Sequence, residues 1–306
     1  MSKKKRKANL PRVSSPAARP LAAEVAAPAP IQQTTGRRFR PSPAVVAGIF
    51  VAAIFLLTLY IRIYLPYDRV FADGSIRLVG ADSYYHVRLV ENLLGNSFQR
   101  ITFDPYTFFP HGATVSWPLF FDWLLAAVIW LVTLGSPSQQ AINVISACYP
   151  AVLAAFIVIP VYFIGKLLFN RWVGVIAAGV IAVLPSGLFV RSRLGALDHH
   201  VAESLFVAVI VLFLLLAIKA AKSKEITFGH LWRRDWQAVR RPLLWSALAG
   251  VFIALYMLTW VAGIFFIFCL FLIFIILSVI NHMRGVSNDY IAVIAFVALS
   301  VGTVRR

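Results

Sequence analysis

The stretch Leu243–Ile280 reads LLWSALAGVFIALYMLTWVAGIFFIFCLFLIFIILSVI and carries no charged residue over 38 positions. An α-helix rises about 1.5 Å per residue, so about 20 apolar residues are enough to cross the hydrocarbon core of a bilayer. The stretch is long enough for two crossings, and Gly263 permits a tight turn between them. We therefore predict two membrane spans, 243–260 and 261–280, divided at Thr259–Gly263.

The whole chain has the composition of a membrane protein. Of its 306 residues, 60% are hydrophobic and 13% are charged, whereas soluble domains carry about 25% charged residues. The mean hydropathy of +0.80 agrees with this. The composition excludes a soluble globular protein, a disordered chain and a nucleic-acid-binding domain with a membrane tail. We predict an all-α, polytopic transmembrane helix bundle, because further apolar runs cover 43–64, 118–134, 142–165, 172–190, 201–218 and 289–303.

The first 42 residues differ from the rest of the chain. Residues 1–42 contain ten Lys or Arg against one acid, Glu24, and are rich in Pro and Ala without apolar periodicity. This composition predicts a disordered tail. The basic run Lys3–Lys7 also fits a nuclear-localisation signal. A cytoplasmic juxtamembrane tail explains the run better, because Lys and Arg accumulate in cytoplasmic segments next to spans. The net charge of +17 then indicates orientation, and we expect no nucleic-acid partner.

The same charge rule orients the spans. The loop 219–241 holds seven Lys or Arg against two acids, and we predict that it is cytoplasmic, like the turn 166–171. Because the tail 1–42 is cytoplasmic, the segment after the first span lies outside. An odd number of crossings must therefore connect this segment to the cytoplasmic turn 166–171. The run 118–134 is short and carries Asp122, which is costly at membrane depth. We therefore predict that this run forms an interfacial or re-entrant helix.

Seven spans remain in a predicted transmembrane domain 43–306, and two segments then share the outer face of the plasma membrane. These are the first external loop, 67–141, and the second external loop, 191–200. Eight of the twelve acids fall in or beside them. A long loop in a compact protein is often functional, so we searched both segments for chemistry.

The first external loop contains GADSYYHVRLVEN at 80–92. Tyr84, Val87 and Leu94 recur at helical spacing, so we predict a short helix from Ser83 onward. Asp82 would then be its N-cap, where Asp is favoured. The other interpretation is that Asp82 is a functional carboxylate facing the second segment.

The second segment reads RSRLGALDHHVAE at Arg191–Glu203. Asp198 and His200 point the same way if the chain is extended there, and Glu203 would follow about one helical turn later. Carboxylate oxygens and imidazole nitrogens suit Mn²⁺ or Mg²⁺, with Zn²⁺ possible. No CxxC or HExxH motif accompanies them. The alternative is a helix N-cap at Asp198 with interfacial histidines, His199 among them.

Two arginines precede this group. Arg191 and Arg193 could bind phosphate through their guanidinium groups, or they could simply extend toward the membrane surface at the end of a span. Together the two external segments predict a metal-type cluster and a phosphate-type cluster beside the bilayer. That combination fits chemistry on a lipid-linked anionic substrate.

At this point the chain resembles a known family, the catalytic subunit of oligosaccharyltransferase in its single-subunit archaeal or bacterial form, over the N-terminal transmembrane part. Four stretches carry the resemblance: Asp82 with Arg88, FDPYTFFPHG at 103–112, Arg191 through the triplet Asp198-His199-His200, and Trp260 with Gly263.

The resemblance implies a membrane glycosyltransferase of protein N-glycosylation. Such an enzyme moves a glycan from a polyprenyl phosphate or pyrophosphate carrier to Asn in Asn-X-Ser/Thr of an acceptor polypeptide. By the same resemblance, Asp82, Asp198 and His200 would be catalytic and would hold Mn²⁺ or Mg²⁺, with Arg191 in support. The predicted substrate-binding residues are Arg88, Arg193, His199 and Glu203.

The chain also departs from the family. A further acidic residue in a later external loop and a C-terminal domain with Trp-Trp-Asp are absent from it, so we expect an incomplete N-terminal part. Three alternatives stay open. One is another polyprenyl-dependent transferase of the O-mannosyl or aminoarabinose type, which would lack the Asp-His-His group. The others are a transporter with an ion relay and a non-catalytic membrane protein.

Overall fold

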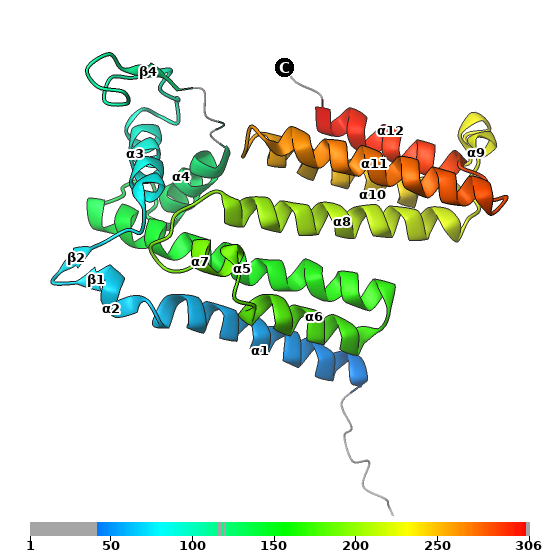
Figure 1. Ribbon diagram of the computed structural model, residues 1–306, viewed down its shortest axis with the longest axis horizontal. Helices are drawn as coiled ribbons and strands as arrows, with labels where there is room; N and C mark the ends of the chain where they lie inside the picture. Colours follow the sequence, from blue (N-terminus) through cyan, green and yellow to red (C-terminus); the bar gives the residue numbers. More distant parts are fainter. Residues whose placement is uncertain (1–41, 116–117, 119, 304–306) are drawn as a thin grey trace, which may run out of the picture. The chain divides into compact units, whose positions relative to one another are not determined.

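The computed structural model describes residues 42–115, 118 and 120–303, which belong to one compact unit. The predicted disordered tail lies outside these residues except for Ser42. Within the described residues, seven long or mid-length helices run side by side (Figure 1). They are α1 (Pro43–Tyr64), α5 (Gln139–Leu168), α6 (Arg171–Val183), α8 (His200–Lys222), α10 (Trp236–Met257), α11 (Gly263–Met283) and α12 (Asp289–Thr303).

Helix α8 lies between two groups of helices. On one side it packs against α5, which also contacts α1 and α6, and on the other it packs against α10, which contacts α12 (Figure 1). Small residues allow the closest approaches. A Cβ at Gly165 of α5 would lie 2.8 Å from the Cα of Gly174 in α6. The bundle is therefore held by helix packing, as the sequence predicts for an all-α membrane protein.

Five helices are long and apolar enough to cross a membrane: α1 with its extension to Val70, α5, α8, α10 and α11. The other two apolar helices of the bundle, α6 and α12, have 13 and 15 residues. Thirteen residues extend only about 20 Å. The polytopic helical fold is confirmed, whereas the number of seven spans stays a prediction. The boundary predicted at Thr259–Gly263 is confirmed, because α10 ends at Met257 and α11 begins at Gly263.

Two predicted segments have different limits in the structure. The apolar run 172–190 is broken, because α6 ends at Val183 and Pro185 disfavours helical geometry in the residue before it. A separate short helix, α7 (Gly187–Arg191), follows. The basic loop 219–241 is also shorter than predicted. Helix α8 continues to Lys222 and α10 begins at Trp236, so the connection holds only α9 (Phe228–Trp232) and its flanks.

The long segment between α1 and α5 contains three helices, including the two that the sequence predicted near 83 and in 118–134. It contains α2 (Tyr67–Val70), α3 (Ala81–Gly95) and α4 (Phe120–Val132). Two small antiparallel hairpins, which the sequence did not predict, complete it: β1 (Phe71–Ala72) with β2 (Ser75–Ile76), and β3 (Phe103–Asp104) with β4 (Ala113–Thr114). Helix α4 occupies the run expected to be an interfacial helix, and it packs against α3.

A tight turn after α7 joins the separate parts of this end of the bundle. We call residues 192–195 the junction turn. The N–H of Leu194 donates to the Arg62 carbonyl at 2.9 Å, and the N–H of Gly195 donates to the Ala147 carbonyl at 2.9 Å. The Gly195 carbonyl accepts from the N–H of Val79 at 2.8 Å. One turn thus ties together α1, α5 and the loop that leads from β2 into α3.

The junction turn requires glycine at position 195. The φ angle of Gly195 is +80°, and a Cβ there would lie 3.0 Å from Val70 Cγ2 and 3.3 Å from the Arg77 carbonyl oxygen. We expect Gly195→Ala to lower the free energy of unfolding by about 1–2 kcal/mol from the backbone alone, measured by unfolding in detergent. Gly187→Ala is the control, because a Cβ at Gly187 meets nothing within 4 Å. An equal loss in both variants would contradict this prediction.

Candidate functional site

The junction turn leads directly into the candidate site at the start of α8. Asp198 is 8% exposed, and its two carboxylate oxygens have separate partners. The guanidinium Nη1 of Arg191 donates to Oδ2 at 2.7 Å, and the backbone N–H of His200 donates to Oδ1 at 3.1 Å. Asp198 therefore makes the cap-like bond that we considered from the sequence. It is also held by Arg191, which lies seven residues earlier.

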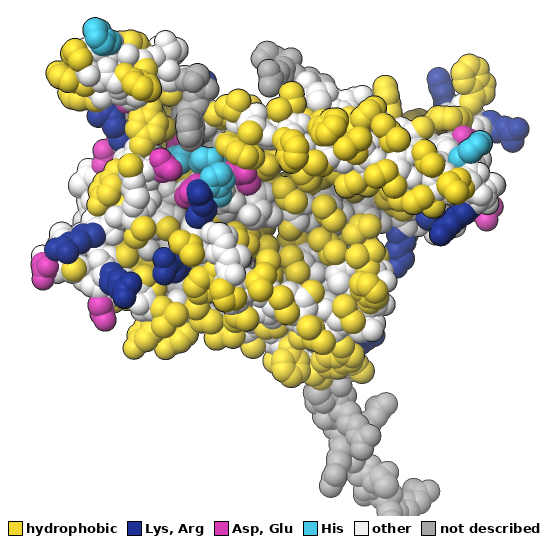
Figure 2. Space-filling model, viewed as in Figure 1, with side chains coloured by type: hydrophobic (Ala, Val, Ile, Leu, Met, Phe, Trp, Pro, Cys, Tyr) yellow, Lys and Arg dark blue, Asp and Glu magenta, His cyan; other side chains and the backbone are white. Residues whose placement is uncertain are grey.

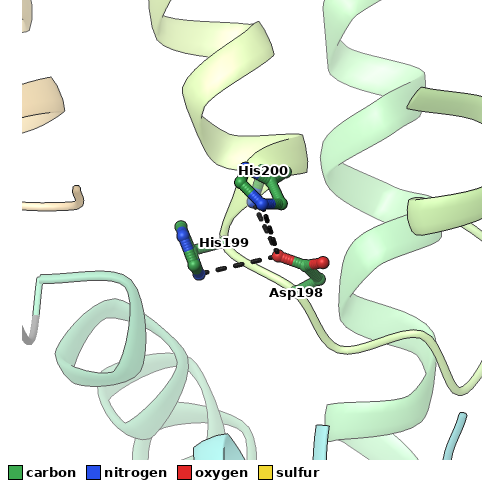
Figure 3. Close-up of side chains that lie close together, drawn as sticks. All are labelled: Asp198, His199 and His200. Atoms are coloured by element: carbon green, nitrogen blue, oxygen red, sulfur yellow. Dashed lines mark hydrogen bonds and ion pairs between the residues drawn. The ribbon is translucent and has the colours of Figure 1, made fainter. Parts of the chain in front are cut away.

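Asp198, His199 and His200 form a metal-type cluster. One ligand atom from each lies within 4.8 Å of the others. Both imidazoles approach the same carboxylate oxygen (Figure 3), with His199 Nδ1 at 3.5 Å and His200 Nε2 at 3.9 Å from Asp198 Oδ1. Burial, followed by the neighbouring charges of His200 and His86, lowers the pKa of His199 to about 4. The His199 imidazole is therefore neutral at neutral pH, which is the form that binds metals.

Glu203 lies behind the two imidazoles. Its Oε1 is 2.7 Å from His200 Nδ1 and 3.4 Å from His199 Nε2, and the side chain is buried. A carboxylate in this place fixes the tautomer and orientation of a histidine ligand. The predicted role of Glu203 in substrate binding is not tested by this geometry, which places it next to the histidines.

A second buried pair supports the cluster, and the sequence analysis gave it no role. His86 Nδ1 in α3 lies 2.6 Å from Asp122 Oδ1 in α4, with side chains 2% and 0% exposed. On its other side, His86 Nε2 is 3.4 Å from His199 Nδ1. From the sequence alone, Asp122 is only a residue too polar for membrane depth. The available signal was the spacing of Asp82 and His86, which share one face of a helix at i and i+4.

The structure corrects the prediction for Asp82. The N-cap of α3 is Gly80, and Asp82 lies inside the first helical turn, so it is not the cap. Its side chain is exposed and has no hydrogen bond or ion pair with the described residues. Asp82 is not among the three residues of the metal-type cluster. It lies one turn before His86, the residue of α3 that reaches His199.

The two arginines among the predicted substrate-binding residues, Arg88 and Arg193, have different surroundings. Arg88 is engaged, with Nη2 2.9 Å and Nε 3.2 Å from the Asp104 carboxylate and its guanidinium 4.5 Å from the Tyr106 ring. Burial alone would raise the pKa of Asp104, but the Tyr106 N–H and the charge of Arg88 hold it below its usual value. Arg193 is half-buried, and its side chain has no hydrogen bond or ion pair with the described residues.

Trp260 borders the cluster from the connection between α10 and α11. Its ring centroid lies 5.7 Å from that of His200 and 6.4 Å from that of His199. Figure 2 shows histidine, acidic and basic side chains gathered beside the start of α8, next to hydrophobic side chains. These features define a class, a polytopic membrane protein with a carboxylate–imidazole cluster at one end of its helix bundle.

The comparisons with known proteins identify the family. The family model described as "Oligosaccharyl transferase STT3, N-terminal" matches residues 40–304, so the chain belongs to this family. The resemblance found in the sequence is thereby confirmed.

Similar proteins are archaeal. The chain is 33% identical over 252 residues to the dolichyl-monophosphooligosaccharide–protein glycotransferase AglB of Haloferax volcanii, covering 82% of this chain and 24% of that relative. It thus spans about a quarter of the length of this relative. A solved structure of the archaeal oligosaccharyltransferase AglB from Archaeoglobus fulgidus is also similar, with a TM-score of 0.74 and 26% sequence identity. That structure contains an inhibitory peptide and a dolichol-phosphate, and the match covers 85% of this chain and 29% of the AglB chain. A crystal structure of the Archaeoglobus fulgidus oligosaccharyltransferase in complex with Zn and sulfate has a TM-score of 0.71 and 28% identity, covering 83% and 30%.

The buried Asp122–His86 pair gives a test of the site's electrostatics. We expect Asp122→Asn to lower the free energy of unfolding by about 1–3 kcal/mol, because the buried His86 imidazole loses its carboxylate hydrogen-bond partner. Asp73→Asn is the control, since the ion pair of Asp73 with Arg77 is exposed at 85% and 60%. Exposed pairs contribute at most about 1 kcal/mol. Denaturant unfolding of both variants in detergent would contradict the prediction if Asp73→Asn cost as much as Asp122→Asn.

Proposed function

We propose that this chain is the N-terminal part of a membrane oligosaccharyltransferase. In the proposed reaction, a glycan moves from a polyprenyl phosphate or pyrophosphate carrier to the amide nitrogen of Asn in Asn-X-Ser/Thr. The observation that carries the proposal is the Asp198-His199-His200 cluster, held by Arg191 in a chain of this family. The dolichol-phosphate and the peptide bound to the Archaeoglobus fulgidus AglB support a lipid donor and a polypeptide acceptor.

The proposed metal is a divalent cation, Mn²⁺ or Mg²⁺, held by Asp82, Asp198 and His200, with His199 in reach. The donor set fits, because it mixes carboxylate oxygen with imidazole nitrogen, and such a mixture suits Mn²⁺ better than Mg²⁺. The zinc-bound Archaeoglobus fulgidus structure supports a metal in this family. A bound cation would act as a Lewis acid for the negative charge that develops on the leaving phosphate.

The chain's own residues then position the reacting groups. Arg191 orients the Asp198 carboxylate, and Glu203 orients the two imidazoles. Arg193, which is free of other partners among the described residues, is the proposed contact for the carrier phosphate. The asparagine nitrogen attacks the anomeric carbon from the side opposite the phosphate. The bond from that carbon to the phosphate oxygen breaks, the phosphate stays with the lipid, and the amide nitrogen loses a proton.

We also propose an orientation for the chain. The cluster and the segment between α1 and α5 lie on the outer face of the plasma membrane, and the N-terminus lies in the cytoplasm. The basic residues of the connection from α8 to α10 gather at the opposite end of the bundle (Figure 2), in agreement with the positive-inside rule.

Manganese binding tests the proposed ligands. We expect the full chain in detergent to bind Mn²⁺, and we expect Asp82→Asn, Asp198→Asn and His200→Ala each to weaken binding by at least about tenfold, because losing an outer-shell partner alone costs about 10–100-fold. Titration calorimetry measures the affinity. Asp68→Asn is the control, because Asp68 is exposed and has no ion pair with the described residues. An unchanged affinity in Asp198→Asn would remove the metal assignment.

Lipid binding tests the proposed substrate without requiring the rest of a longer enzyme. We expect the chain to bind dolichyl phosphate, and we expect Arg193→Gln to weaken this binding by about tenfold, equivalent to about 1.4 kcal/mol. Arg69→Gln removes the same charge from an exposed arginine in the segment after α1 and should change little. Native mass spectrometry with dolichyl phosphate and uncharged dolichol measures both. Equal affinity for the two lipids would argue against a phosphate-recognising site and for the non-catalytic alternative.

A further inference from the structure

Arg62 is a buried guanidinium near the end of α1, and it has no carboxylate partner among the described residues. The residue is 1% exposed. A charge withdrawn from water is costly even when it is paired, and an ionisable residue inside a membrane protein is a functional candidate by default. Arg62 therefore needs an explanation beyond helix packing.

Its contacts converge on the junction turn. The Nε of Arg62 donates to Ser192 Oγ at 2.8 Å, and its own backbone carbonyl accepts from the N–H of Leu194 at 2.9 Å. The guanidinium also lies 5.0 Å from the Phe189 ring. One residue thus fixes the turn at two points, through its side chain and through its backbone.

The end of α6 supplies the stabilisation that a carboxylate would otherwise give. Nη1 of Arg62 donates to the Ala182 carbonyl at 2.7 Å, and Ala182 lies in the last turn of α6. The last carbonyls of a helix lack intrahelical partners and carry the negative end of the helix dipole. The guanidinium of Arg62 therefore donates to a carbonyl at a helix end and to a hydroxyl, in place of a carboxylate. These two hydrogen bonds fix its position.

The junction turn is connected to both segments of the candidate site. Ser192 directly follows Arg191, whose guanidinium holds Asp198 at 2.7 Å. The Gly195 carbonyl holds Val79, which lies three residues before Asp82. We propose that Arg62 is a positioning residue, which sets the Asp198 cluster through the junction turn. This inference rests on the proposed function.

Lysine would not replace arginine in this role. The planar guanidinium reaches the Ser192 hydroxyl and the Ala182 carbonyl with two different nitrogens, whereas an ammonium is a single point charge. Arg62→Lys keeps the positive charge but cannot make both side-chain hydrogen bonds, to Ser192 Oγ and to the Ala182 carbonyl. It therefore separates positioning from the simple presence of charge.

The experiment uses the full chain in detergent and two readouts. Hydrogen–deuterium exchange follows the amides of residues 192–198 against those of α8, and titration calorimetry follows Mn²⁺ binding. We expect Arg62→Lys to speed exchange in 192–198 but not in α8, and to weaken Mn²⁺ binding by about tenfold, as loss of an outer-shell partner does. Thr58→Val is the control, because Thr58 is fully buried one turn earlier on α1 and its hydroxyl donates to the Ile54 carbonyl of the same helix. We expect it to change neither readout.

Two results would overturn the inference. One is unchanged exchange in 192–198, and the other is faster exchange with unchanged Mn²⁺ affinity, which would leave Arg62 a structural residue only. Should Arg62→Lys fail to fold, Ser192→Ala removes only the Nε acceptor and is judged by the same criteria. Should the unaltered chain not bind Mn²⁺, the metal assignment of the proposed function fails. Binding of dolichyl phosphate then replaces Mn²⁺ binding as the second readout for Arg62→Lys, with the same two criteria.

Discussion

The arrangement of the candidate site depends on three backbone hydrogen bonds of the junction turn. Leu194 and Gly195 bond to carbonyls of α1 and α5, and Gly195 accepts from Val79 ahead of α3. These segments are far apart in the sequence, and in a membrane protein their apolar surfaces gain little from leaving lipid for protein. Specific hydrogen bonds and close packing must therefore fix their relative positions, and the turn provides both at one place.

Buried charge imposes the second constraint. Asp198, Glu203 and Asp122 are each at most 8% exposed, and each lies against a cationic or imidazole partner. Removing one partner of a buried pair leaves an uncompensated charge, which is strongly destabilising. The pairs are linked, because His86 touches His199 and His199 lies beside Glu203. The buried pairs therefore form one continuous set of contacts around the metal-type cluster.

The sequence predicted the helices and both site segments because these follow from local pattern. The length of the apolar runs predicted the long spans. The distribution of charge predicted that 118–134 is an interfacial or re-entrant helix. The limits of 172–190 were wrong although Pro185 marked the break. The pairing of His86 with Asp122 could not be predicted, because 36 residues separate them and no periodicity links α3 to α4. The contacts of Arg62 could not be predicted for the same reason, because Ser192 lies 130 residues away in the sequence.

The distribution of ionisable groups decides between an enzyme site and a transport pathway. A relay across the membrane needs titratable groups along the length of a helix, near the bilayer midplane. In α8, residues 204–218 contain no titratable side chain. His200 and Glu203 lie in the first turn of the helix, and Asp198 and His199 lie just before it. The clustered groups at the start of α8 therefore favour the proposed site at the membrane boundary over a transport pathway. A lipid whose tail lies in the bilayer and whose phosphate lies at its surface presents its reactive group at that depth, which a transported solute need not do.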